Sequence, residues 1–61
     1  MANREVRSHA IEKGVLLWMV AEALGISDSS FSRKLRRELP EEERERILAI
    51  IDQIAAEREV G

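Results

Sequence analysis

The sequence predicts an all-α protein that folds as one compact four-helix domain over residues 1–61. Apolar residues recur at intervals of three and four along most of the chain, which is the spacing of one face of a helix. Gly14, Gly25 and Pro40 separate these periodic segments, and they stand where helices commonly end or begin. The predicted helices cover about residues 3–13, 17–24, 28–37 and 40–57.

The first predicted helix, residues 3–13, begins at Asn3, whose side chain can cap the free N–H groups of the first turn. Val6 and Ala10 share one face and Ile11 lies beside it, so this helix presents a modest apolar stripe. Its basic residues have two interpretations, contact with phosphate groups or a solvated surface, and the second is favoured for each of them: Arg4, Arg7 and Lys13.

The stretch from residue 17 to residue 37 contains two short helices joined by a turn. The first has its apolar and small residues on one face: Leu17, Val20, Ala21 and Leu24. Gly25 ends this helix, because glycine reaches a positive φ without strain, and Ser27 can cap the next one. Phe31 and Leu35 are the predicted buried residues of the second helix. Two short helices joined by a Gly-containing turn of about three residues form a helix-turn-helix, whose second helix lies in the DNA major groove.

This segment resembles the bacterial helix-turn-helix superfamily. Five residues match the pattern of this superfamily. They are Ala21 at the small position, Gly25 at the turn, Ile26 at the buried turn position, Ser27 at the cap and Phe31 at the apolar position of the recognition helix. The run GISDSSFSRKLR is similar to the recognition segments of Fis-like activators and of small DNA-binding proteins from phages and mobile elements. Repressors of the Cro and lambda type have their second buried residue three after the first, where this chain has Lys34; Leu35, four after, fits the Fis-like pattern.

The resemblance implies that the second helix reads DNA. At 100° per residue, Ser29, Arg33 and Arg36 cluster opposite Phe31, with Arg37 on their flank. Arg33 has the reach for bidentate contact with guanine. Asp28 can accept from a cytosine amino group or act as a second capping residue, and Lys34 is expected to extend towards a phosphate. The predicted DNA-binding residues are Ser27, Asp28, Ser29, Ser32, Arg33, Lys34, Arg36 and Arg37.

The net charge of −2 is distributed unevenly along the chain. Residues 1–37 carry seven basic and four acidic residues, whereas residues 38–61 carry three basic and eight acidic ones. Four of the seven N-terminal cations lie between Arg33 and Arg37, on the predicted recognition helix. Phosphate binding depends on where the cations lie rather than on the total charge. We therefore expect the acidic half to face away from DNA and the affinity for random DNA sequence to be modest.

The last predicted helix begins at Pro40, which suits the first helical position because it has no N–H to leave unpaired. The three glutamates that follow favour the positive end of the helix dipole. Its apolar stripe is about 160° wide, more than one small core requires. We expect one edge to form a homodimer that places two recognition helices about 34 Å apart, one DNA turn. The alternative is that the core absorbs the whole stripe: Ile47, Leu48, Ile50, Ile51, Ile54 and Ala55.

Trp18 and Met19 point away from the apolar face of the second helix. Three interpretations are open: packing against the first or the last helix, an exposed patch for a partner, and contact of Trp18 with the DNA backbone. Packing is favoured, and a dimer contact is the next. The predicted dimer interface accordingly consists of Trp18, Ile50 and Ile54.

The composition argues against an enzyme. The chain has no cysteine, no tyrosine, a single histidine (His9) and no Gly-rich phosphate loop, so no catalytic constellation, metal site or cofactor is expected. No segment resembles a signal peptide or a membrane span, which predicts a cytoplasmic protein, associated with the bacterial nucleoid when it binds DNA. No small-molecule ligand is expected.

The leading functional prediction is sequence-specific binding of double-stranded DNA by a small transcriptional regulator, repressor-like and of phage or mobile-element type. Exclusion of other proteins from the bound site is the simplest mechanism, because the sequence shows no ligand-binding or activation domain. Two alternatives use the same fold. One is a protein–protein interaction module that does not bind DNA, and the other is an excisionase-like accessory factor in recombination.

Overall fold

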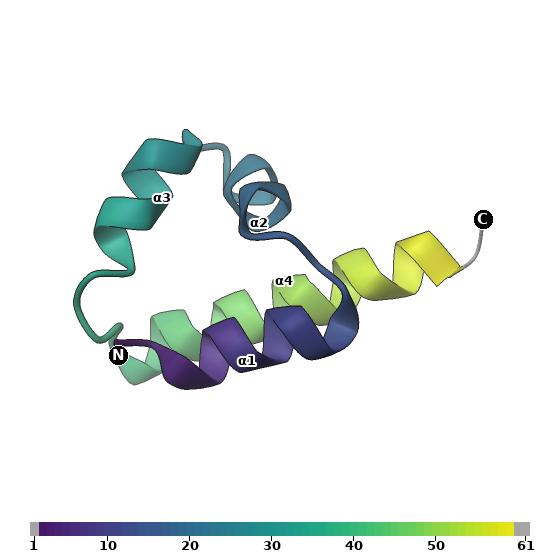
Figure 1. Cartoon of the computed structure of the whole chain (residues 1–61), viewed down its shortest axis with the longest axis horizontal. Helices are drawn as coiled ribbons and strands as arrows, with labels where there is room; N and C mark the ends of the chain where they lie inside the picture. The colour runs from purple at the N-terminus through teal and green to yellow at the C-terminus, as the bar shows by residue number, and fades with distance from the viewer. Residues whose placement is uncertain (1, 60–61) are drawn as a thin grey trace.

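The computed structural model describes residues 2–59, and the side chains as far as residue 58. Within this range it contains four α-helices and no strand: α1 (Arg4–Lys13), α2 (Leu17–Leu24), α3 (Asp28–Lys34) and α4 (Glu41–Glu59) (Figure 1). The predicted all-α, four-helix fold is therefore confirmed. None of the helices in the described range combines the length and the apolar character needed to cross a lipid bilayer.

The helices α1 and α4 lie side by side and run in the same direction (Figure 1). Near their ends, the Arg58 guanidinium donates to the carbonyl of Gly14 over 2.6 Å, and earlier along the pair His9 Nε2 lies 2.6 Å from Asp52 Oδ1. The other two helices lie together on one side of this pair, and α2 contacts both α3 and α4. Because α1 and α4 are parallel, the start of α1 lies beside the linker that joins α3 to α4.

The core draws side chains from all four helices and from the loop after α1. Phe31 and Leu35 are each 1 % exposed, as predicted, and they belong with Ile47 and Ile51 to one continuous cluster. Fully burying a side chain of this size contributes about 1.5–3 kcal/mol to folding. The cluster confirms the predicted apolar faces of the helices, and its buried members are Val6, Ala10, Val15, Val20, Ala21, Phe31, Leu35, Ile47 and Ile51.

The third helix is shorter than predicted. It ends at Lys34 with Leu35 as its C-cap, so the expected extension to residue 37 is wrong. In a longer helix the carbonyl of Leu35 would accept from the N–H of Leu39. Here the Leu35 carbonyl accepts instead from Asn3 Nδ2, and the Leu39 N–H donates to Asn3 Oδ1, each over 2.9 Å. A side chain from the start of the chain thus takes the place of the next helical hydrogen bond.

Three smaller predictions also need correction. Asn3 precedes α1, but its side chain makes no capping hydrogen bond. Ile11 is 80 % exposed, so it does not widen the apolar stripe of α1. Pro40 lies one position before α4, and its carbonyl accepts the N–H of Arg44 over 2.9 Å. The observed bounds of α1 and α4 otherwise lie within a few residues of the predicted ones.

Candidate nucleic-acid interface

The turn between α2 and α3 consists of three residues, Gly25, Ile26 and Ser27. Gly25 has a φ of 76°, the left-handed conformation that glycine adopts without steric cost. Its N–H donates to the Glu22 carbonyl, and the N–H of Ile26 donates to the Ala21 carbonyl, each over 3.0 Å. These bonds satisfy the last carbonyls of α2 and end the helix. The two short helices are therefore joined by a three-residue turn at the position that the sequence predicts.

Ser27 starts α3 as predicted, because its Oγ accepts the backbone N–H of Ser30 over 3.1 Å. We expect Ser27→Ala to lower the free energy of unfolding by about 0.5–2 kcal/mol, since an N–H group of a short helix loses its partner. Urea titration of both proteins, followed by circular dichroism, measures this difference. Ser32→Ala, at an exposed position of the same helix, is the control and should change stability by less than about 0.5 kcal/mol. Equal losses in the two variants would contradict the assignment of the cap.

The face of α3 opposite Phe31 is free of contacts with the core. Every residue predicted to contact DNA is exposed, and the structure brings all of them onto α3, its cap and the turn that follows it: Ser27, Asp28, Ser29, Ser32, Arg33, Lys34, Arg36 and Arg37. Because α3 ends at Lys34, Arg36 and Arg37 lie in the turn and not on the helix, and their predicted helical positions are wrong. The N–H of Arg36 still donates to the Arg33 carbonyl over 3.2 Å, which keeps the turn close to the helix.

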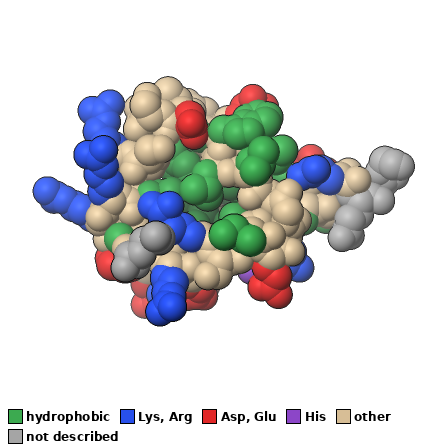
Figure 2. All heavy atoms as spheres, in the orientation of Figure 1, with side chains coloured by type: hydrophobic (Ala, Val, Ile, Leu, Met, Phe, Trp, Pro, Cys, Tyr) green, Lys and Arg blue, Asp and Glu red, His purple; other side chains and the backbone are tan. Residues whose placement is uncertain are grey.

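The cations of this surface differ in their partners. Lys34 forms an ion pair with Glu43 of α4. Arg33, Arg36 and Arg37 make no ion pair with any residue in the part of the chain that the structure describes. Figure 2 shows Lys and Arg side chains projecting from the side of the molecule where α3 lies. Three arginines are thus available to an anionic partner, whereas Lys34 would first have to leave a carboxylate.

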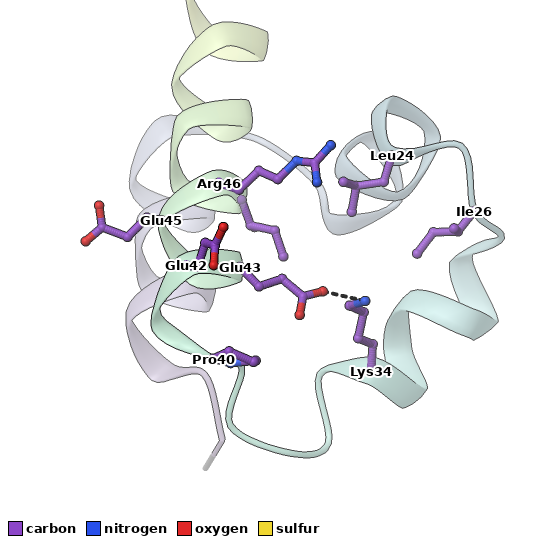
Figure 3. Close-up of a pocket in the computed structure, with 9 residues that line it drawn as sticks. Leu24, Ile26, Lys34, Pro40, Glu42, Glu43, Glu45 and Arg46 are labelled. Carbon is purple, nitrogen blue, oxygen red and sulfur yellow. Dashed lines mark ion pairs between the residues drawn. The ribbon is translucent and has the colours of Figure 1, made fainter.

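An open groove of about 780 Å³ separates the turn and the inner side of α3 from the start of α4 (Figure 3). Ile26 borders this groove and is 36 % exposed, so the prediction that it is buried is wrong. The Lys34–Glu43 ion pair crosses the groove. The remaining lining residues are of mixed character: Leu24, Pro40, Glu42, Glu45, Arg46 and Ile47. With three carboxylates and two cations, this groove is a less favourable site for phosphate than the outer surface of α3.

The apolar residues predicted to form a dimer interface divide into two groups. Ile50 and Ile54 pack against the core and are only partly exposed. Trp18 is 48 % exposed and lies outside the core, whereas Met19 packs against it. The packing interpretation is therefore correct for Met19 and wrong for Trp18. The two most exposed large apolar residues, Ile11 and Leu16, were not part of the predicted interface. The exposure of these two residues was difficult to predict from the sequence, because each is adjacent to a core residue.

Residues 2–58 contain no group of three or more His, Cys, Asp or Glu side chains that could hold a metal ion. The one histidine is next to Asp52 on the surface formed by α1 and α4.

Comparison with protein-family models, curated proteins and solved structures finds no match to this chain. The fold and the site place it among small all-α domains, with two short helices joined by a three-residue turn and three exposed arginines on and just after the second of them.

Proposed function

We propose that this protein binds double-stranded DNA in a sequence-specific manner and acts as a small transcriptional regulator of the helix-turn-helix type. One observation carries the proposal. Arg33, Arg36 and Arg37 lie together on the exposed side of α3 and its following turn, without acidic partners among the described residues. The opposite side of the helix is held in the core by Phe31 and Leu35, so the cationic surface has a defined orientation.

In this proposal the N-terminal part of α3 enters the major groove. Its small serines allow close approach to base edges, and Arg33 has the length and the donor geometry to pair with guanine. Arg36 and Arg37 lie beyond the end of the helix, which suits contacts with the phosphate backbone better than contacts with bases. Occupation of an operator would repress transcription by excluding other proteins, in the cytoplasm of a bacterial cell and on DNA of phage or mobile-element origin.

The test is fluorescence anisotropy of a labelled random-sequence duplex, titrated with protein from low to physiological salt. Each phosphate contact contributes about −0.9 to the slope of log affinity against log salt concentration. We expect salt-dependent binding that weakens and loses slope in the Arg33→Ala, Arg36→Ala double variant. The control is the Lys13→Ala, Arg46→Ala double variant, which removes the same charge from exposed positions on α1 and α4. Absence of binding at low salt, or equal losses in both variants, would refute the proposal.

We further propose a homodimer, because two copies would present two recognition helices to adjacent half-sites. Trp18 supports this proposal, since its large apolar side chain remains half-exposed. We expect sedimentation velocity at high micromolar concentration to show a dimer that Trp18→Ala shifts towards monomer. A monomer at this concentration would contradict the proposal. Ile50 and Ile54 contribute less than the sequence predicts, because most of their surface is used by the core.

A second candidate function is a protein–protein interaction module that does not use DNA. It is favoured by the exposed apolar side chains of Ile11, Leu16 and Trp18, which are 80 %, 56 % and 48 % exposed. Ile11 and Leu16 line the same shallow hollow, and exposed apolar surface on a small domain commonly marks an interface. The two functions respond to different substitutions. Arginine replacements on α3 abolish only the first function, and Leu16→Ser affects only the second.

A further inference from the structure

Asn3 is the only buried polar residue in the described range, with 2 % of its surface exposed. Its side chain belongs to the start of the chain, yet all three of its hydrogen bonds are to the linker between α3 and α4. Nδ2 donates to the carbonyls of Leu35 and Arg37 over 2.9 and 2.8 Å, and Oδ1 accepts the N–H of Leu39 over 2.9 Å. The backbone N–H of Asn3 also donates to Glu38 Oε1 over 2.9 Å. Both donors and the acceptor of the amide are therefore used.

These bonds determine the path of the chain after α3. Leu35 and Leu39 are the pair that would bond to each other if the helix continued. Since the Asn3 amide binds both of them, the helix stops and the segment between them follows a turn. Arg36 and Arg37 are in that segment. If the helix continued, Arg37 would be rotated by 100° from Arg36 about the helix axis and would lie about 1.5 Å further along it. The two arginines would then point to different faces of the helix.

The residue type at position 3 meets two requirements at once. Its φ of 59° lies in the left-handed region, which asparagine tolerates better than most other residues. Glycine adopts this conformation more easily but has no amide group. Aspartate has a similar shape, but it would place a carboxylate oxygen against the carbonyls of Leu35 and Arg37. Asparagine alone combines the backbone conformation with the two donors and one acceptor that the linker needs.

We infer that Asn3 is a positioning residue for DNA binding, whose buried amide holds Arg36 and Arg37 in the orientation in which they contact phosphate. This inference rests on the proposed DNA-binding function and adds to it a residue that has no contact with DNA. Asn3 acts through the backbone, because it binds the carbonyl of Arg37 itself and the groups on either side of the two arginines.

The inference is separable from a general loss of stability. A variant that is only less stable has a smaller fraction of folded, active protein. Where this folded fraction is the same at every salt concentration, the apparent affinity falls by the same factor throughout, and the slope against salt does not change. A variant that misplaces two arginines removes phosphate contacts, and the slope of log affinity against log salt then falls by up to about 1.8. The slope is thus the measurement that distinguishes positioning from stability.

The test uses Asn3→Gly, which keeps the backbone conformation and removes the amide. Salt titrations on a random-sequence duplex compare the parent, Asn3→Gly, the Arg36→Ala, Arg37→Ala double variant, and all three changes combined, each at a temperature where circular dichroism shows it folded. We expect Asn3→Gly to have a shallower slope by about 0.9 to 1.8, the loss of one or two phosphate contacts. We expect no further change of slope when it is added to the double arginine variant. Hydrogen exchange should show faster exchange of the Leu39 amide, which loses its acceptor.

If Asn3→Gly does not fold, Asn3→Asp replaces it, because aspartate retains the acceptor for Leu39. Ala2→Asp then serves as the control for the added charge, and only Asn3→Asp should lose slope beyond it. A parent-like slope in a folded variant at position 3, with reduced thermal stability alone, would overturn the inference and leave the proposed function intact. A parent protein that binds no DNA at low salt would overturn both. The two failures are therefore distinguishable in one set of titrations.

Discussion

Phe31→Ala is expected to lower the free energy of unfolding by about 3–5 kcal/mol, a large part of the total for a domain of this size. Phe31 is 1 % exposed and is the buried residue of α3 in the hydrophobic core. Removing a buried phenylalanine costs about 3–5 kcal/mol. A domain of 61 residues has a total free energy of unfolding of roughly 3–9 kcal/mol at typical values per residue. With no cysteine the chain has no disulfide to limit the loss.

Circular dichroism during thermal unfolding measures this effect, and Ile11→Ala is the matched control. Ile11 is also a large apolar residue, but it is 80 % exposed, and its replacement should change the free energy of unfolding by no more than about 0.5 kcal/mol. We expect a cooperative transition at nearly the same temperature in the parent and in Ile11→Ala, and a midpoint lower by at least roughly 12 °C in Phe31→Ala. A midpoint for Phe31→Ala near that of the parent would show that α3 is not packed as the structure describes.

The second large effect concerns discrimination between DNA sequences. Once a preferred site has been selected from random duplexes, we expect Arg33→Ala to reduce the preference for that site over random DNA by roughly 5- to 150-fold. This range corresponds to about 1–3 kcal/mol for one bidentate contact with a base. Arg33 is the arginine that belongs to α3 itself, so in the proposed complex it is the one that enters the major groove with the helix. The measurement is a pair of anisotropy titrations, one on each duplex.

Lys34→Ala provides the comparison for Arg33→Ala, because the two residues are neighbours of equal charge with different surroundings. Lys34 is paired with Glu43 in the groove beside α4, and its removal should leave the preference for the selected site close to that of the parent. The comparison also tests the predicted phosphate contact of Lys34, which would appear as a lower salt slope on both duplexes. If Lys34→Ala reduces discrimination more than Arg33→Ala, the assignment of the base-reading residue is wrong.

The helices and their buried faces were predictable because they depend on local sequence. Gly25 ends α2 at the expected residue with a positive φ, and Ser27 caps α3 through the expected N–H group. Phe31 and Leu35 are buried one turn apart, as their spacing predicts. The exposure of the predicted DNA-facing residues on α3 itself, Asp28, Ser29, Ser32, Arg33 and Lys34, agrees with the same periodicity. In each case the pattern that makes the prediction spans about two helical turns of sequence.

The errors concern residues whose neighbours are distant in the sequence. Ile26 has the residue type of a buried turn position, but the groove beside α4 leaves it 36 % exposed. Trp18 was expected to pack, and no helix covers it sufficiently to bury it. The ion pair of Lys34 joins α3 to α4, so the preference of lysine for phosphate could not be judged from α3 alone. Side-chain burial and ion pairing depend on the packing of elements, which periodicity does not specify.

The sequence by itself determined where α1 and α2 end, which faces of the helices are apolar, and where the cations are concentrated, because these properties depend on residue type and on spacing within one or two helical turns. Only the tertiary structure decided where α3 ends and how the arginines beyond it are held. That outcome depends on Asn3, which lies 32 positions before Leu35 in the sequence. The parallel packing of α1 on α4 brings the Asn3 amide to the linker, where it replaces a helical hydrogen bond with bonds of its own.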